Sequence, residues 1–358
     1  MKSPHITALR VLIVALVVFG LPRTSLAAEV MRAHFINVGQ ADATLLEFPC
    51  GAILIDAGAQ DSQHVTRLVN YLTGFFQTRS DLNKTLKSII ITHNHIDHTK
   101  ALKAVVKGFT VKRYLDNGQL EGLGTANPRW VRANATTEGR QIVVSEISDD
   151  DVTSVSPRTG LTNSAIDPLN CTNVDPKIAI LSGRLSENPG WPHDEFDNKN
   201  NHSLVVRIDF GQASFLFTGD LEEHAIETMV DWYKETDTLD VDVYQVGHHG
   251  SHNGTIESLI EAMTPEIAVI SMGEWDFGKG TNNRFTTWHY GHPRKAVVKT
   301  LTAGIARRRS TSIRIRVAKA SKKFSLYTVR KAIYGTGWSG TIKVRATTDG
   351  KFRVTLDN

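Results

Sequence analysis

Six consecutive residues from His93 to His98 contain four side chains that can ligate a metal ion. The sequence His-Asn-His-Ile-Asp-His follows a β-branched run, residues 86–92, that predicts a strand, and a helix is expected over residues 99–107. Imidazole nitrogens and a carboxylate that converge at a strand end suit Zn²⁺ or another divalent transition metal. The alternative for such a stretch is a solvated polar turn.

Further candidate ligands occur at the ends of other predicted strands. His202 precedes one strand, Asp220 ends a hairpin, and His248 and His249 follow a third strand. Taken singly, each has an ordinary explanation, because Thr-Gly-Asp resembles a helix N-cap and a lone histidine is usually a surface residue. Because strand ends on one edge of a sheet can converge, the set as a whole predicts a metal site.

The elements that must position these residues are short strands and helices. Strands are predicted at 31–38, 43–48, 52–55, 86–92, 178–181, 203–210, 213–217, 241–246, 267–271, 313–317, 324–329, 341–346 and 351–356. Helices are predicted at 62–76, 99–107, 221–234, 256–263 and 294–301. Residues 116–177 have weak periodicity, so we expect a long irregular excursion with a short helix near Trp130 that overhangs the site.

The composition describes an ordinary globular chain with a sizeable core. Of its 358 residues 41% are hydrophobic and 22% are charged, and 27 glycines and 11 prolines are close to average usage. Collagen-like, disordered and disulfide-scaffold classes are therefore excluded. The two cysteines, Cys50 and Cys171, are expected to form a disulfide in an oxidising compartment, with two buried free thiols as the alternative.

Residues 1–27 resemble a cleaved secretory signal peptide. Lys2 and Arg10 precede an apolar run over 11–21, and Ser-Leu-Ala at 25–27 is a small-residue exit. The run is short for a membrane anchor, which is the alternative. We therefore expect a periplasmic or secreted protein with no stable membrane span after cleavage. Residues 28–358 are expected to form a single domain with a basic, β-rich C-terminal part from about 306 to 358.

Charge is strongly segregated along the mature chain. Residues 28–276 contain 19 basic and 35 acidic residues, whereas residues 277–348 contain 17 basic and no acidic ones. The basic block either docks on the acidic body or faces a polyanion, such as nucleic acid or an anionic envelope polymer.

The order of these residues resembles the metallo-β-lactamase superfamily. Its signature is HxHxDH, a third histidine, an aspartate in a Thr-Gly-Asp-like turn and a last histidine, and this chain has each element in order. The resemblance implies a site for two divalent ions, which are Zn by default with Mn or Fe as alternatives. Asp220 would bridge the two ions. One ion would be held by His93, His95 and His202, and the other by Asp97, His98 and one of His248 and His249, with His249 favoured because glycine follows it.

A closer resemblance is to the metallo-β-lactamase domain of ComEC-type competence proteins. It rests on Val-Gly-Gln-Ala-Asp-Ala at 38–43 and on residues 53–58, 201–204, 217–220, 248–251 and 290–293. Ala41 stands where the family has glycine, His202 lies where relatives carry Asn and Ser, and about a dozen extra residues precede Tyr290. The transmembrane channel segments of those proteins are not found in this sequence.

The resemblance implies an α/β fold, the αββα four-layer sandwich, and hydrolytic chemistry. A water bridging two divalent ions is deprotonated near neutral pH and attacks phosphorus or a carbonyl carbon. Asp97 would orient that water and His248 would protonate the leaving group. His292 would contact either the substrate or the groups around the ligands, although Gly-His-Pro also fits a plain helix start. Asp56 is expected to brace the metal loop by hydrogen bonds.

The resulting hypothesis is an exported phosphodiesterase, with a nuclease as first choice. Related alternatives are a phosphorylcholine-esterase-like enzyme and a β-lactamase-like hydrolase. A different class of function is a DNA- or polyanion-binding module that has lost turnover and uses the basic block.

Overall fold

Two β-sheets packed face to face form the centre of the protein in a computed structural model that describes residues 29–357. The predicted signal peptide, residues 1–27, lies outside the described residues. Within them the first sheet has eight strands in the order β18-β17-β1-β2-β3-β5-β7-β8, and the second has six in the order β16-β13-β12-β11-β10-β9.

Each predicted strand segment overlaps an observed strand, whereas the strands over 110–111, 113–116, 143–146 and 333–335 were not predicted, and the one over 308–320 is much longer than expected. The first sheet comprises β1 (Val30–Phe35), β2 (Thr44–Phe48), β3 (Gly51–Ile55), β5 (Ser88–Ile90), β7 (Arg113–Asp116), β8 (Val143–Glu146), β17 (Thr341–Thr347) and β18 (Phe352–Asp357). The second comprises β9 (Lys177–Ser182), β10 (Val205–Phe210), β11 (Ala213–Phe217), β12 (Val243–Gln245), β13 (Ile267–Ile270) and β16 (Ile333–Gly335). Two small sheets pair β4 (Thr85–Leu86) with β6 (Thr110–Val111) and β14 (Arg308–Ala320) with β15 (Lys323–Lys331).

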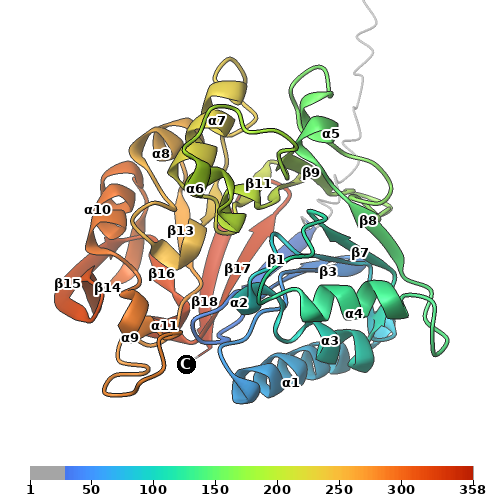
Figure 1. The fold of residues 1–358 in the computed structure, drawn as a ribbon, viewed down its shortest axis with the longest axis horizontal. Helices are drawn as coiled ribbons and strands as arrows, with labels where there is room; N and C mark the ends of the chain where they lie inside the picture. Colours follow the sequence, from blue (N-terminus) through green and yellow to red (C-terminus); the bar gives the residue numbers. More distant parts are fainter. Residues whose placement is uncertain (1–28, 358) are drawn as a thin grey trace, which may run out of the picture.

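Helices cover the outer face of each sheet, which confirms the predicted αββα arrangement (Figure 1). The first sheet is covered by α1 (Ser62–Thr78), α3 (Leu102–Gly108) and α4 (Ala126–Asn134), and the second by α7 (Glu223–Tyr233), α8 (Glu257–Met263) and α10 (Lys295–Gly304). Shorter helices are α2 (Ile96–Thr99), α5 (Asp149–Thr153), α6 (His193–Phe196), α9 (Thr287–Tyr290) and α11 (Thr336–Ser339). In residues 29–357, no helix is long and apolar enough to cross a membrane.

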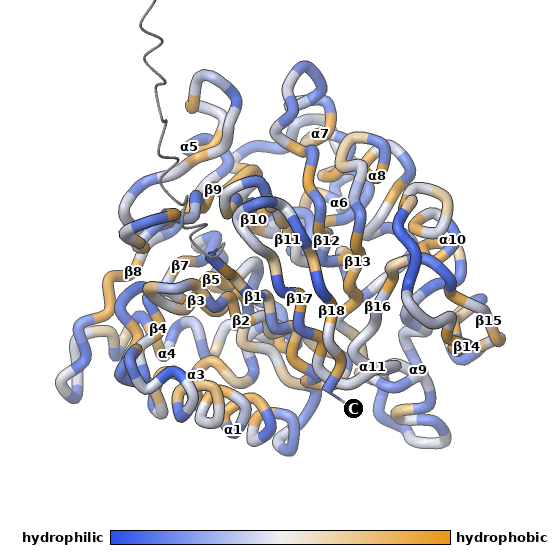
Figure 2. Tube along the Cα trace, turned by 180° about the vertical axis from the view of Figure 1, so that it is seen from behind, coloured by the Kyte–Doolittle hydropathy of each residue, from blue (hydrophilic) through white to orange (hydrophobic). Residues whose placement is uncertain are grey.

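Alternating side chains along the central strands explain the layers. Phe35 of β1 belongs to the core cluster between the sheets, where its ring stacks on Phe217 at 6.2 Å. Leu45 of β2 belongs instead to the second cluster, with Leu68 and Leu72 of α1. Successive strand residues point to opposite faces, so strands buried on both faces are apolar throughout. Figure 2 shows the resulting hydrophobic colouring of the strands beneath more hydrophilic peripheral loops.

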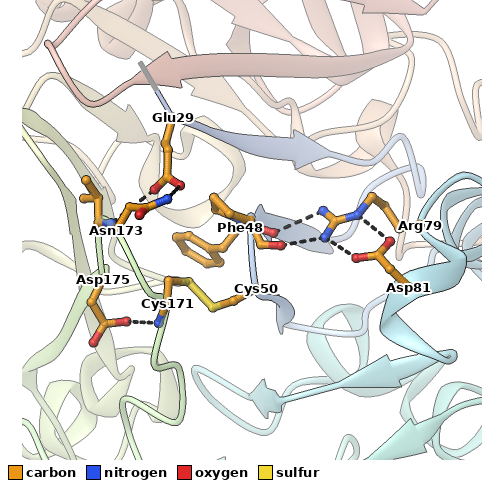
Figure 3. Close-up of a disulfide and its surroundings, with 10 residues drawn as sticks. Glu29, Phe48, Cys50, Arg79, Asp81, Cys171, Asn173 and Asp175 are labelled. Atoms are coloured by element: carbon orange, nitrogen blue, oxygen red, sulfur yellow. Dashed lines mark hydrogen bonds and ion pairs between the residues drawn. A yellow bond between two sulfur atoms is a disulfide. The ribbon is translucent and has the colours of Figure 1, made fainter. Parts of the chain in front are cut away.

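A disulfide joins Cys50 and Cys171, which confirms the expected pairing over the free-thiol alternative. Cys50 lies in the turn between β2 and β3, and Cys171 precedes β9 (Figure 3). The same turn is held by the guanidinium of Arg79, which donates to the carbonyl oxygens of Phe48 and Pro49. The bridge therefore ties the start of the second sheet to the first.

Two predicted segments differ from the structure. The helix expected over 99–107 is two helices, because α2 begins at Ile96 inside the ligand-rich segment and α3 begins at Leu102. The excursion over 116–177 contains the expected helix near Trp130, but it also contributes β8, which pairs in parallel with β7 as an edge strand. The sequence of β8, Val-Val-Ser-Glu, has only four residues, of which the two at its ends are exposed and the two in the middle are partly buried, so it shows no alternation of buried and exposed positions.

Candidate metal centre

Polar loops at one edge of the two sheets bring the candidate ligands together. The segment from His93 follows β5, the turn with Asp220 follows β11, and His249 lies in a 3₁₀ turn after β12. The loop after β3 packs directly on the ligand-rich segment, since Ala57 N–H donates to His98 O at 2.9 Å. A Cβ atom on Gly58 would lie 1.6 Å from Asp97 O, so only glycine allows this approach.

Asp56 fixes the orientation of the segment, as expected from the sequence. Its Oδ1 accepts the backbone N–H of Thr92 at 2.8 Å, and its Oδ2 accepts the Thr92 hydroxyl at 2.9 Å and His98 Nδ1 at 2.7 Å. Asp56 itself has a φ of 56°, a left-handed conformation that Asp tolerates better than most residues. Its carboxylate is thus committed to bracing the segment.

Three imidazoles present an Nε2 lone pair to carboxylates. His98 Nδ1 donates to Asp56, and His249 Nδ1 donates to the carbonyl of Ser271 at 2.8 Å. His93 Nδ1 lies 3.2 Å from the Thr92 hydroxyl, which already donates its proton to Asp56 and can therefore only accept. Each neutral ring then carries its lone pair on Nε2, the atom that ligates a metal.

Those Nε2 atoms face Asp220 and Asp97. His98 Nε2 lies 3.2 Å from Asp220 Oδ1, and His249 Nε2 lies 3.4 Å from Asp97 Oδ2 and 3.6 Å from Asp220 Oδ2. Both nitrogens are buried and make no hydrogen bond within the described part of the chain. A lone pair facing a carboxylate is repulsive unless a proton or a cation lies between them, so the donor set fits a metal ion.

The convergence is tight at four residues. One ligand atom each from Asp97, His98, Asp220 and His249 lies within 4.8 Å of every other. Burial lowers the pKa of His249, but the carboxylates of Asp220 and Asp97 outweigh it and raise that pKa to about 9. Burial likewise lowers the pKa of His98, yet Asp220 and Asp56 hold it well above its ordinary value. Both pKa shifts show that the carboxylates favour a positive charge at this place.

His93 and His95 approach the same carboxylate from the other side. His93 Nε2 lies 3.9 Å from Asp220 Oδ2 and 3.1 Å from His95 Nδ1. Burial lowers the pKa of both rings, so both are neutral and each can offer a nitrogen lone pair to a cation. These two nitrogens and Asp220 could contribute to a second position beside the first.

The structure does not bring His202 into this cluster. Its Nδ1 accepts the backbone N–H of Leu185 at 3.2 Å, and its Nε2 donates to the carbonyl of Phe196 at 2.7 Å. Both ring nitrogens are therefore occupied by backbone groups, and the ring lines a different cavity. The third-histidine role expected from the sequence is corrected on this geometric ground.

Asn200, two residues earlier in the same 3₁₀ turn, lines the metal cavity instead. Its Nδ2 donates to the Glu222 carboxylate at 2.7 Å, which leaves Oδ1 buried without a partner in the described structure. Sequence reasoning missed Asn200. The repeated asparagine before His202 was the available signal.

His248 lies at the rim, next to a cluster ligand. Its Nδ1 is 3.1 Å from Glu222 Oε1, and its Nε2 is 3.7 Å from Asp220 Oδ2. Burial raises the pKa of Glu222, but His248 and Asn200 lower it overall, so Glu222 is anionic. His248 and His249 both have positive φ, at 49° and 52°. Such paired left-handed residues are strained, and strain of this kind concentrates at functional sites.

His292 is fixed as a hydrogen-bond donor to the cavity. The Oε1 of Gln40 accepts from Thr287 Oγ1 at 3.1 Å and from Gly273 N at 3.4 Å, so its Nε2 must donate to His292 Nδ1 at 3.0 Å. Burial, with His248 and His249, holds the pKa of His292 well below its ordinary value. The neutral ring therefore carries its proton on Nε2. Sequence reasoning named His292 but missed the role of Gln40.

A cavity of about 290 Å³ opens above these groups. Its floor includes Asp97, Asp220 and His249, and its wall includes His95, Asn200, His248 and His292. Leu123 from the excursion over 116–177 also lines it, so part of that segment does overhang the site.

Comparisons with known proteins agree with this arrangement. Residues 36–274 match the family model of the metallo-beta-lactamase superfamily. The chain is 26% identical over 277 residues to ComE operon protein 3 of Bacillus subtilis, covering 74% of this chain and 30% of that protein. It is 33% identical over 132 residues to Recombination protein 2 of Haemophilus influenzae, covering 37% of this chain and 16% of that protein. The chain thus spans under a third of these relatives.

Solved structures with a related fold are more distant. The metallo-beta-lactamase fold protein YhfI of Bacillus subtilis aligns over 84% of this chain and 99% of its own, with 10% identity and a TM-score of 0.41. Human tRNase Z, short form, aligns over 67% of this chain and 92% of its own, with 15% identity and a TM-score of 0.37.

Proposed function

The chain belongs to the metallo-beta-lactamase superfamily, and from this membership we propose that it is an exported, metal-dependent phosphodiesterase. The observation that carries the proposal is the convergence of His98 and His249 Nε2 on two carboxylates at the floor of a cavity. Tightly bound divalent ions fit that donor set, with Zn as first choice and Mn or Fe as alternatives.

The candidate ligands form two metal positions, of which the first has four converging ligands and the second has fewer. Asp97, His98, Asp220 and His249 would hold the first ion. His93, His95 and Asp220 would hold a second ion. Asn200 Oδ1 would take the place that the sequence assigns to His202. When bound, such ions supply Lewis acidity and lower the pKa of a coordinated water.

The remaining residues suit the hydrolysis of a phosphodiester. A water oxygen forms a bond to phosphorus, the bond to the leaving oxygen breaks, and that oxygen takes up a proton. His248 would donate that proton, because it lines the cavity beside Asp220 and its Nδ1 lies 3.1 Å from Glu222 Oε1. Neutral His292 would donate a hydrogen bond from Nε2 to a phosphoryl oxygen. Asp97 would orient the attacking water.

Two features support a location outside the cytoplasm. Residues 1–27 resemble a secretory signal peptide, and Cys50 and Cys171 form a disulfide. Disulfides persist in oxidising compartments such as the periplasm and the extracellular medium.

The test uses mature protein supplemented with Zn²⁺, Mn²⁺ or Fe²⁺, elemental analysis, and hydrolysis of bis(4-nitrophenyl) phosphate. We expect bound metal, chelator-sensitive turnover, and loss of turnover in His249→Ala with the circular dichroism spectrum unchanged. A protein that takes up no metal, or a fully active His249→Ala, would overturn the proposal.

A polyanion-binding module without turnover is the second candidate. The observation in its favour is the stretch over residues 277–348, which contains 17 basic and no acidic residues. Binding through such a surface would weaken steeply with salt and survive chelation.

A further inference from the structure

Three aromatic rings form a continuous path from the wall of the metal cavity to the surface. The Tyr290 ring stacks on His292 with centroids 5.6 Å apart and planes 17° apart, and Phe285 meets Tyr290 edge-on at 6.5 Å. Exposure rises along the path, from 5% for His292 to 36% for Tyr290 and 60% for Phe285. All three residues line the cavity.

Exposed apolar side chains gather at this mouth. Six large apolar side chains are exposed within residues 29–357, and Leu123, Phe285 and Tyr290, half of them, line this cavity. Leu123, at 83% exposed, faces the path from the excursion over 116–177. Apolar groups concentrated around a cavity mark a binding surface, whereas scattered ones need no explanation.

The chain holds Phe285 in place. Its backbone carbonyl accepts the Gln60 side chain at 2.9 Å, and its N–H donates to Asn283 at 3.0 Å. Gln60 also accepts from Gln40 N, which belongs to the residue that orients His292. The exposed ring is thus linked by hydrogen bonds to the group that faces the reacting centre.

Exposed cations lie on the segments next to the ring-bearing one. Arg284 precedes Phe285 and is exposed, and Lys322 is an exposed residue at the tip of the β14–β15 hairpin. The tip is fixed against α9, because Lys322 N–H donates to Trp288 O at 2.9 Å. Figure 1 shows this hairpin and α9 side by side at one edge of the molecule. The neighbouring Ser321 hydroxyl also donates to the carbonyl of His289, so the hairpin tip contacts α9 at two places.

We propose that Phe285 and Tyr290, with Arg284 and Lys322, form a subsite for an unpaired nucleic-acid strand, in which a base stacks on the rings and its neighbouring phosphates meet the cations. This inference rests on the proposed phosphodiesterase function. It adds a substrate class from residues beyond position 274, where the family match ends.

The exposed rings and the nearby positive charges favour an unpaired nucleic-acid strand over other ligands. The candidate ligands Asp220 and His249 are only 2% and 3% exposed, so a scissile phosphate must enter the cavity that the rings line. A base-paired duplex keeps its bases stacked inside and cannot lay one on Phe285, whereas an unpaired strand can. A choline headgroup would place its cation beside Arg284 and Lys322, which repel it.

The experiment measures binding separately from turnover. Metal-supplemented protein is titrated into a labelled thymidine strand of about twelve nucleotides with phosphorothioate linkages, and into the corresponding duplex, by fluorescence anisotropy. We expect the single strand to bind more tightly. Phe285→Ala should weaken its binding by about 5- to 100-fold, and Phe285→Trp should preserve it. Val143→Ala, which truncates an exposed apolar residue on β8, should leave binding unchanged.

A salt series tests the cations. Arg284→Ala and Lys322→Ala should each lower the slope of log Kd against log salt by about one. Arg308→Ala removes an exposed cation of the same basic block at the other end of β14 and should not change the slope. An equal effect of Arg308→Ala would overturn the localised subsite.

The two proposals fail in different ways. Strand binding that depends on Phe285, without any phosphodiester hydrolysis, supports the subsite and rejects the phosphodiesterase. Hydrolysis of a small phosphodiester, with equal affinity for strand and duplex or with wild-type binding by Phe285→Ala, rejects the subsite alone.

Discussion

Replacing Asp56 by asparagine tests whether the protein sets the direction of the His98 lone pair. Asparagine matches aspartate in size and tolerates the left-handed φ of 56° at this position. Its Oδ1 can still accept the Thr92 N–H. Its Nδ2, however, is a donor at the place where Asp56 Oδ2 accepts from the Thr92 hydroxyl at 2.9 Å and from His98 Nδ1 at 2.7 Å.

The expected result is a loss of metal affinity with the fold retained. The Thr92 hydroxyl can rotate, but His98 escapes the donor–donor contact only by moving its proton to Nε2, the atom that faces Asp220 at 3.2 Å. Loss of such an orienting partner weakens metal binding by about 10- to 100-fold. That range corresponds to about 1.4 to 2.7 kcal/mol. Zn²⁺ titration against a chromophoric chelator measures it directly.

Asp242→Asn is the matched control. Asp242 Oδ2 also accepts two hydrogen bonds, from Ser214 N and Ser214 Oγ at 2.8 Å each, but it precedes β12 whereas the ligands follow it. This variant should lose some stability and keep its metal affinity. Wild-type Zn²⁺ affinity in a folded Asp56→Asn protein would refute the reasoning.

Four other changes have defined outcomes. His95→Ala and Asp220→Ala should each abolish phosphodiester hydrolysis with an unchanged circular dichroism spectrum, and full activity in Asp220→Ala would reject its bridging role. Cys171→Ser should lower the free energy of unfolding by about 4 to 5 kcal/mol in a denaturant titration, because the bridge closes a sequence separation of 121 residues. Burial raises the pKa of Glu47, but His34, Arg79 and Arg32 lower it to about 2 overall. The ionised form therefore stabilises the fold by about 2 kcal/mol above the unfolded pKa, and this is lost as pH falls through the folded pKa. The stability difference between wild type and Glu47→Gln should then shrink below pH 4.5, and a constant difference down to pH 2 would contradict the assignment.

Much of the site was predictable because its residues lie at strand ends. Apolar runs locate β5, β11 and β12, and the residues that follow them must meet at one edge of the paired sheets. Asp97, His98, Asp220 and His249 converge for this reason. The same rule fails inside the turn at Lys199–His202, where 3₁₀ geometry turns Asn200 toward the cavity and His202 toward backbone groups. The order of residues in a short turn does not specify which side chain faces inward.

Contacts between distant segments were beyond sequence reasoning. Gln40 and His292 are 252 positions apart, and no spacing indicates that one amide fixes the tautomer of the other side chain. The edge strand β8 was missed for a related reason. Its four residues adopt the strand conformation because they pair with β7, and their own sequence pattern does not indicate it.

The basic residues over 277–348 have different roles, which a count of charges does not distinguish. Arg307 pairs with Glu266 at 2.7 Å and donates to the carbonyl of Phe352, and Arg309 lies 4.4 Å from the Tyr334 ring centroid. The Arg307–Glu266 pair docks the block on the acidic body, as the first explanation of the charge segregation requires, whereas the other two contacts lie within the C-terminal part itself. Arg284 and Lys322 are instead exposed, and Arg284 directly precedes Phe285, which lines the metal cavity. The absence of acids over 277–348 is consistent with both roles, because an acid would compete for the docking arginines and repel an incoming phosphate.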